Sequence, residues 1–119
     1  MGQACLKFGL MFKSLPRGLF ISAHDGGAVQ SILKNWPERR VRVISITDGA
    51  SVLGLGDAGI QGMGLSVSQT ACYTSCGGLV PHVALPISID VGCDAAELVG
   101  SPYYVGLKQR RAQVRLIAR

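Results

Sequence analysis

Three short apolar segments, separated by stretches of helical character, place the strongest constraint on what this sequence can fold into. They span residues 18–22, 41–47 and 85–91. Residues 41–47 are β-branched at almost every other position, which is typical of a strand buried on at least one face. Because strands and helices alternate with short connections, the sequence predicts an α/β fold: a layered domain with a mostly parallel sheet. The predicted sheet strands are residues 19–21, 41–46 and 85–90.

The predicted helices follow from apolar spacing and from the residues that end them. Residues 28–33 place apolar side chains on one helical face, and Pro37 stops that helix. Residues 63–76 form a longer predicted helix, which Gly77 and Gly78 close as a glycine C-cap. Further helical segments are expected at residues 1–12 and 94–99.

Two local signals predict a hairpin and a helix cap. Asp48 and Gly49 follow the second strand, and Asp-Gly between two runs of β type indicates a hairpin. The return strand would be residues 51–55, so the sheet is expected to carry a β-hairpin arm. Asp94 is expected to cap the helix that follows it, with Glu97 completing a box-like pattern.

Length and composition exclude several classes of protein. A chain of 119 residues is long enough for one domain at most. Its 48% hydrophobic content indicates that the chain is not mainly disordered. Its apolar stretches are too short to span a bilayer. The N-terminus lacks the apolar core of a secretory signal. The predicted location is cytoplasmic, with a mitochondrial location, whose targeting segment is not present, as the alternative.

The net charge of +5 is concentrated near the C-terminus. Such a tail can bind nucleic acid through its charge, or it can be an exposed, solvated end. No aromatic residues alternate with these cations to stack on bases, so nucleic-acid binding is the less favoured alternative. The five cations of the last twelve residues are Lys108, Arg110, Arg111, Arg115 and Arg119.

The cysteines and histidines do not form a recognisable metal motif, and no metal site is predicted. No CxxC pair is present, and the histidines lie far from any cysteine spacing. Cys72 and Cys76 would share one face of the predicted helix. The thiols are expected to be small buried groups in a reducing compartment. The residues concerned are Cys5, Cys72, Cys76, Cys93, His24 and His82.

Gly54, Gly56 and Gly59 fit the G-x-G-x-x-G pattern of dinucleotide-binding loops. The context differs from that fingerprint, because Gly62 and Gly64 interrupt any helix that starts at Gly59. The fingerprint also requires an acidic residue about 20 positions further on, and Asp90 lies too far along the chain to serve. These glycines are therefore weak cofactor-binding candidates, and we expect them to serve backbone packing instead.

Several multi-residue blocks occur in one order over most of the chain. They are Pro16-Arg-Gly-Leu-Phe-Ile-Ser, Thr47-Asp-Gly, Leu53-Gly-Leu-Gly-Asp, Gly62-Met-Gly, Tyr73-Thr-Ser-Cys-Gly-Gly, Leu85-Pro, Asp90-Val-Gly and Tyr104-Val-Gly-Leu-Lys-Gln-Arg. Over roughly residues 2–111, these blocks resemble the N-terminal domain of malic enzymes, the NAD(P)-dependent decarboxylating malate dehydrogenases. The family's own blocks include Arg-Pro-Arg-Gly-Leu-Phe-Ile-Ser and Thr-Asp-Gly-Glu-Arg-Ile-Leu-Gly-Leu-Gly-Asp.

The resemblance implies a reaction in which L-malate is oxidised by hydride transfer to NAD(P) and decarboxylated to pyruvate, with Mg or Mn as the Lewis acid. It also implies a lysine base, a tyrosine acid and an arginine that binds a carboxylate. The lysine position is Gln69 in this sequence, and the arginine position is Ser51. A glutamine amide cannot accept and release a proton near neutral pH, so Gln69 cannot replace a lysine base. Serine is short and uncharged, so it cannot form the bidentate pair that arginine makes with a carboxylate.

These departures lead to a prediction about function. The family's tyrosine lies just before the point where this sequence begins, and its metal-binding acids and Rossmann domain lie downstream. We therefore expect residues 1–111 to be a partial malic enzyme N-terminal domain, followed by a basic tail at 112–119. The chain alone is expected to retain no catalytic residue, to bind no cofactor and to be inactive. The alternatives are a non-catalytic module that associates with a full-length malic enzyme or with itself, and a nucleic-acid-binding fragment. The choice between NAD and NADP is left open.

We also predict the roles of three individual side chains. Asp48 and Asp57 are expected to cap turns. Tyr73 is expected to belong to the core.

Overall fold

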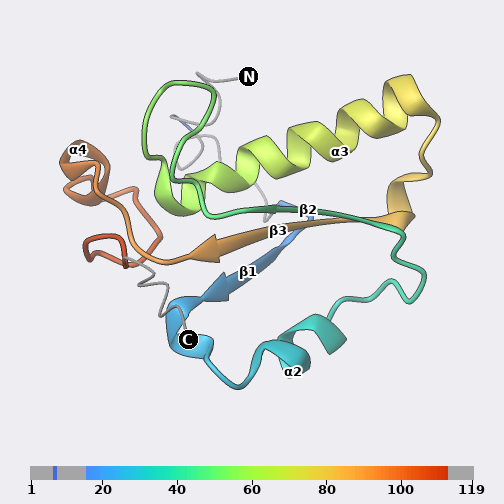
Figure 1. Ribbon diagram of the computed structural model, residues 1–119, viewed down its shortest axis with the longest axis horizontal. Coiled ribbons are helices and arrows are strands. Elements are labelled where there is room, and N and C mark those ends of the chain that lie inside the picture. Colours follow the sequence, from blue (N-terminus) through green and yellow to red (C-terminus); the bar gives the residue numbers. More distant parts are fainter. Residues whose placement is uncertain (1–6, 8–15, 113–119) are drawn as a thin grey trace, which may run out of the picture.

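A computed structural model describes residue 7 and residues 16–112 of the chain. Its sheet has three strands in the order β1-β3-β2, and both strand pairs are parallel (Figure 1). The predicted parallel α/β domain is therefore confirmed. The strands are β1 (Leu19–Ser22), β2 (Val43–Thr47) and β3 (Ala84–Asp90). The helices are α2 (Val29–Lys34), α3 (Met63–Gly77) and α4 (Ala96–Val99), with short 3-10 turns at Ala23–Asp25, Gly59–Gly62 and Pro81–Val83.

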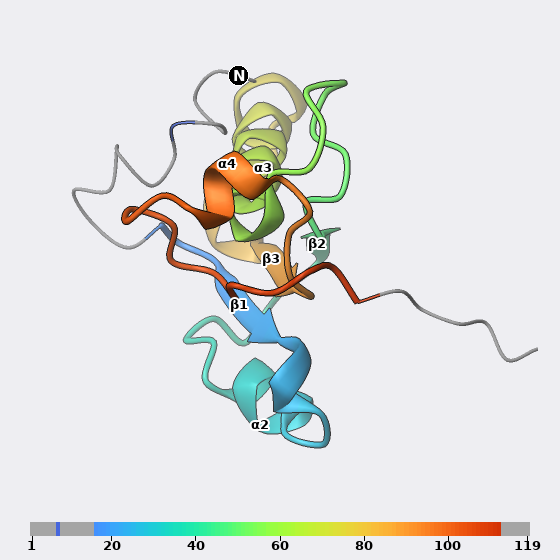
Figure 2. The same cartoon turned by 90° about the vertical axis from the view of Figure 1, so that its left-hand side faces the viewer.

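The two faces of the sheet carry different helices (Figures 1 and 2). On the α2 face, Leu85 and Ile87 of the central strand pack with Ile21 and Trp36 as the larger core cluster. On the opposite face α3 lies along β3 and β2. The alternation of side chains along β3 explains this division, since successive residues point to opposite faces. Nearly all of β3 is buried, as expected for the central strand of a parallel sheet.

α3 begins and ends close to where the sequence predicts. Gly78 follows it in the left-handed conformation with φ at +67°, and its N–H donates to the carbonyl of Tyr73. Glycine adopts this conformation at little cost, so the predicted glycine C-cap is confirmed. Gly62 precedes the first helical residue, and Gly64 lies inside the first turn. The α-helix thus starts at Met63, as predicted, and not at Gly59, where a short 3-10 turn lies.

The predicted β-hairpin arm is not present, because residues 51–55 form a loop and not a return strand. Leu53 and Gly54 have φ values of +51° and +73°, which no strand residue adopts. The loop closes on itself, since the Val52 N–H donates to the Gly56 carbonyl at 3.0 Å. Val52 is buried against Ala58, and that burial holds the segment away from the edge of the sheet.

Asp94 does not cap the short helix α4, which corrects the second local prediction. Ala95 holds the N-cap position with no side-chain cap. The Asp94 carboxylate instead accepts a hydrogen bond from the backbone N–H of Arg111 at 3.1 Å. The helix predicted for residues 1–12 lies outside the described residues, apart from Lys7. Within residue 7 and residues 16–112, no helix is long and apolar enough to cross a bilayer.

Candidate functional site

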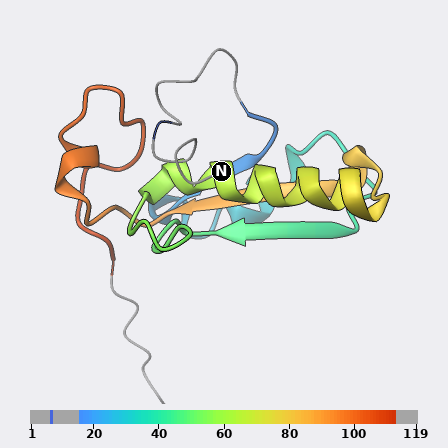
Figure 3. The same cartoon turned by 90° about the horizontal axis from the view of Figure 1, so that it is seen from above.

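The candidate site lies at the carboxyl ends of the parallel strands, the edge where ligands bind in open α/β sheets. α4 and the segment after it lie beyond this edge, next to the loop that joins β2 to α3 (Figure 3). The loop begins at Asp48 directly after β2 and runs to the 3-10 turn at Gly59–Gly62, which leads into α3. Ser51 is exposed in this loop, whereas Gln69 is exposed in the middle of α3.

Gln69 is held against β2 by a single side-chain hydrogen bond. The hydroxyl of Ser45 donates to Oε1 of Gln69 at 2.8 Å. Ser45 is buried, so this bond satisfies a hydroxyl that would otherwise lack a partner on the covered face of the sheet. Among the interactions of the described residues, no hydrogen bond joins Gln69 to Ser51.

The three glycines of the G-x-G-x-x-G pattern do not form a phosphate-binding loop. That loop requires a strand, a tight turn and an immediate helix, but β2 ends at Thr47 and α3 begins only at Met63. Gly54 and Gly56 have φ values of +73° and +89°, and an added Cβ would meet nothing within 4 Å at either position. The packing role predicted for these two glycines is therefore wrong, since backbone conformation is what calls for glycine there.

Gly59 does have the predicted packing role. Its φ is +52°, and an added Cβ would strike the hydroxyl of Tyr104 and lie 2.9 Å from the Cβ of Cys93. The Gly59 N–H also donates to Oδ1 of Asp57 at 2.8 Å. The residues around Gly59 thus form a close-packed turn.

The strongest polar cluster at this edge joins Arg111 to Asp48 and Asp57. Nη2 and Nε of Arg111 donate to the two carboxylate oxygens of Asp57 at 2.5 and 3.0 Å. Nη1 donates to the carboxylate and to the carbonyl oxygen of Asp48, both at 3.1 Å. Only 13% of the Arg111 side chain and 12% of the Asp57 side chain is exposed. Arg111 therefore ties the last described segment to the loop that carries Ser51.

The predicted turn-capping roles of Asp48 and Asp57 are confirmed, but the pairing with Arg111 was missed. Asp48 Oδ1 accepts the N–H of Ala50 at 3.1 Å, as in an Asx turn. The sequence interpretation grouped Arg111 with the solvated basic tail. Its role depends on a contact between residues 54 positions apart, which no local pattern signals.

The environment of Asp57 keeps its carboxyl ionised. Burial by itself raises the pKa of Asp57, but hydrogen bonds from Arg111 and from the backbone N–H groups of Asp94 and Gly59 outweigh it. With the nearby positive charge of Arg111, they leave the pKa of Asp57 below its ordinary value of 3.8. The hydrogen bond to Asp57 raises the pKa of Arg111 above its ordinary value. Both groups are charged at neutral pH, and the cluster acts as a structural ion pair.

A second buried carboxylate, Asp90, fixes the chain that follows the central strand. Its Oδ2 accepts the N–H of Leu107 at 2.7 Å, and its Oδ1 accepts the N–H of Gly92 at 3.1 Å. The backbone N–H of Cys93 donates to the carbonyl of Gln109, and that of Ala112 donates to the carbonyl of Val91. These hydrogen bonds hold the last described segment beside the chain that follows β3. The segment through residue 112 is therefore part of the folded domain. The structure does not describe the remainder of the predicted tail.

The cysteines differ in burial. Cys93 is buried as predicted, but the expectation of buried thiols is wrong for Cys72 and Cys76, which are exposed and free. Tyr73, which lies between them and was expected in the core, is half-exposed. In the described part of the chain, no three residues among His, Cys, Asp and Glu come together in a group that could hold a metal ion.

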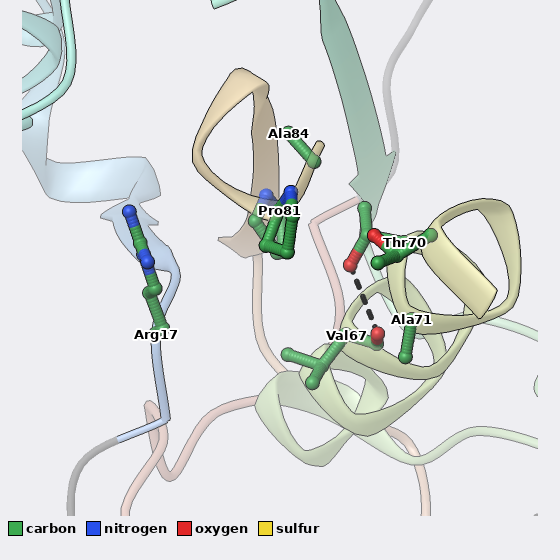
Figure 4. A pocket seen from close by; sticks show the side chains of 8 residues that line it. Arg17, Val67, Thr70, Ala71, Pro81 and Ala84 are labelled. Carbon is green, nitrogen blue, oxygen red and sulfur yellow. Dashed lines mark hydrogen bonds between the residues drawn. The ribbon is translucent and has the colours of Figure 1, made fainter. Parts of the chain in front are cut away.

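Two hollows flank α3. One, of about 320 Å³, lies between α3 and the start of β3. Figure 4 shows Val67, Thr70 and Ala71 of α3 on one wall and Arg17 across from them. Arg17 is paired with Glu38 at 2.7 Å and stacks over Trp36, so its charge is already partnered. The other hollow, of about 740 Å³, lies where the C-terminal part of α3 meets the start of β2.

The fold and the site together define a small parallel α/β domain of the kind found in α/β enzymes, with polar residues gathered beyond the carboxyl ends of its strands. The model of the family "Malic enzyme, N-terminal domain" matches residues 1–117. The chain therefore belongs to the malic enzyme family, which confirms the resemblance inferred from the sequence.

Individual relatives agree with this assignment. An NADP-dependent malic enzyme of Vitis vinifera is 51% identical over 112 residues, which is 94% of this chain and 19% of the relative. A chloroplastic NADP-dependent malic enzyme of Flaveria pringlei is 50% identical over 94% of this chain and 17% of its own length. One from Mus musculus is 50% identical over 95% of this chain and 20% of its own length. The chain thus spans about a fifth of the length of the relatives it matches.

Proposed function

We propose that this chain is a non-catalytic malic enzyme N-terminal domain, which does not oxidise malate by itself. The observation that supports the proposal is that Gln69, an uncharged side chain, stands at the position where the family resemblance implies a lysine base. Its amide cannot accept and release a proton as a base near neutral pH, and its oxygen already accepts a hydrogen bond from the Ser45 hydroxyl at 2.8 Å.

The second position supports the same proposal. Ser51 occupies the place where the resemblance implies an arginine that binds a substrate carboxylate. Its side chain is uncharged and exposed in the loop, so it cannot supply the paired charged hydrogen bonds of a guanidinium. The one partly buried guanidinium of the loop cluster, Arg111, is occupied by Asp48 and Asp57.

The test is an assay of the purified chain with L-malate, Mn²⁺ and either NADP or NAD. We expect no turnover above background from the chain or from a Ser51→Arg, Gln69→Lys double variant. Members of a catalytic unit act together, so restoring two of them recovers almost nothing. Turnover by the isolated chain would overturn the proposal.

The reciprocal experiment uses a full-length malic enzyme. Replacing the lysine and the arginine at the matching positions with glutamine and serine should abolish most activity, while circular dichroism stays unchanged. Full activity in that variant would show that we have misplaced the site. Titration of the chain with NADP and NAD should also give no saturable binding below millimolar concentration.

A bare apolar face favours a second function, association with a full-length NADP-dependent malic enzyme. Ile44 and Ile46 of β2 are 53% and 60% exposed. They pair in register with Leu85 and Ile87, so they lie on the α2 face of the sheet. Because α2 packs against β1, no helix within residues 16–112 covers the β2 part of this face, although parallel sheets are normally covered on both faces.

Sedimentation of the chain with and without a full-length malic enzyme tests this association. We expect a mixed complex that an Ile46→Lys substitution weakens and that a Val105→Lys substitution, at an equally exposed residue outside the sheet, leaves intact. A complex insensitive to Ile46→Lys, or no complex, would contradict it. The cytoplasmic location stays a prediction.

A further inference from the structure

Cys72 and Cys76 present two free thiols to one hollow. They lie four residues apart on α3, about one helical turn, which places them on the same face. Both are exposed, and both line the hollow of about 740 Å³ at the start of β2. Its other walls are largely apolar. They come from Val43, Tyr73, Gly77 and Leu79.

The spacing of these thiols suits a bridging ion better than a direct sulfur–sulfur bond. Residues four apart on a helix have Cβ atoms about 5–6 Å apart. A disulfide needs Cβ atoms about 3.5–4.5 Å apart, so an intact α3 does not allow one. An ion bound about 2.3 Å from each sulfur can join thiolates that are about 4 Å apart.

The donor set selects the class of ion. Thiolates are soft ligands, which favour Cu(I) and zinc over magnesium, calcium or manganese. Structural zinc requires four ligands, and no group of three His, Cys, Asp or Glu exists within residues 16–112. A copper(I) ion can be held by two sulfurs alone, and apolar side chains such as Val43 and Leu79 border the hollow.

We propose that Cys72 and Cys76 form a two-thiolate binding site for copper(I). On binding, each thiol releases its proton to solvent and donates a sulfur electron pair to the metal. Neither copper nor sulfur changes its oxidation state. Neither Gln69 nor Ser51 lines this hollow, and the site does not depend on malate chemistry.

Cys93 provides an internal reference for this site. It is buried at the other end of the molecule, and burial, more than any neighbouring charge, raises the pKa of its thiol. It lies next to Tyr104 and Gly59, not on α3. We therefore expect Cys93 to take no part in copper binding.

The test is an anaerobic titration of the reduced chain with Cu(I) in competition with a chromophoric Cu(I) chelator. We expect one ion per chain, and at least about a tenfold weaker affinity in Cys72→Ser and in Cys76→Ser, because each loses the second, intramolecular ligand. Cys93→Ser and Cys5→Ser should bind as the unaltered chain does. Unchanged affinity in either α3 variant, or weaker binding in Cys5→Ser, would overturn the two-thiolate site.

A matched control keeps the number of thiols and changes only their placement. The Cys72→Ser, Thr74→Cys variant places its two thiols two residues apart, and residues at that spacing do not face each other. Thr74 lines the other hollow. This variant should bind as weakly as Cys72→Ser, and tight binding would contradict the proposal. Circular dichroism of each variant shows that α3 is intact.

Discussion

Arg111 and Asp57, 54 residues apart in the sequence, form a two-pronged ion pair with donor–acceptor distances of 2.5 and 3.0 Å. The same guanidinium reaches the carboxylate and the carbonyl oxygen of Asp48 at the start of the loop after β2. One side chain thus connects the chain beyond β3 to both ends of the loop that contains Ser51. The conformation of that loop depends on a residue outside it.

Substituting Arg111 with alanine is therefore expected to destabilise the domain. The change leaves Asp57 charged and largely buried without its cation, at a cost of about 2–4 kcal/mol in the free energy of unfolding. Urea unfolding followed by circular dichroism measures this loss. Arg110→Ala is the matched control, because Arg110 is the preceding residue and is exposed. This substitution should lower the free energy of unfolding by less than about 0.5 kcal/mol. Equal effects of the two substitutions would show that the ion pair is unimportant.

The same pair predicts a loss of stability in acid. The pKa of Asp57 is lower in the folded chain than in the unfolded chain, so its contribution is present above about pH 4, the unfolded value, and is lost as the pH falls through the folded value. Unfolding midpoints between pH 6 and pH 2.5 measure the loss. The decline should be shallower in Asp57→Asn than in the unaltered chain. Parallel declines would rule out this role for Asp57.

Local patterns predicted the strands and α3 because neighbouring residues determine them. Apolar runs bounded by turn residues give β1, β2 and β3, and Gly78 ends α3 through its own backbone conformation. The hairpin prediction failed because Asp48-Gly49 forms no hairpin turn here and does not fix the conformation of the next residues. That conformation is set by Val52, which packs against Ala58 and the partly buried Leu65.

The candidate site was predictable only where it depends on residue type. The uncharged side chains at Gln69 and Ser51 are visible in the sequence. The bond between Gln69 and Ser45 is not, because it joins a helix to a strand across 24 residues. The exposure of Cys72 and Cys76 follows from the position of α3 over β3 and β2, which leaves part of the helix uncovered.

The glycines of the loop are expected to tolerate alanine unequally. Gly54→Ala has open space, so it costs only the strain of a positive φ, about 1 kcal/mol. Gly59→Ala carries the same strain and also drives a methyl group into Tyr104 and Cys93, for a total of about 3 kcal/mol or more. Thermal or urea unfolding of the two variants gives the comparison. A Gly59 variant as stable as the Gly54 variant would contradict the packing of this turn.

The alkaline limit of stability is expected to depend on Tyr104. This side chain is 4% exposed, and its hydroxyl oxygen accepts the backbone N–H of Ile60 at 3.4 Å. Burial, with the nearby Cys93 and Asp90 groups, raises the pKa of Tyr104 to about 12. The folded chain therefore keeps the phenol proton at a pH where the unfolded chain, with a pKa of about 10, releases it. The contribution of Tyr104 is complete below pH 10 and is lost as the pH rises toward 12.

Tyr104→Phe removes this titration, so its unfolding free energy should fall less between pH 9 and pH 11.5 than that of the unaltered chain. At neutral pH the substitution should cost about 1 kcal/mol, because the Ile60 N–H loses its partner. Tyr103→Phe is the control: Tyr103 is 59% exposed, and its removal should leave the alkaline decline unchanged. Urea midpoints at pH 9, 10 and 11.5 provide the measurement. If Tyr103→Phe and Tyr104→Phe flatten the decline equally, the buried phenol is not its source.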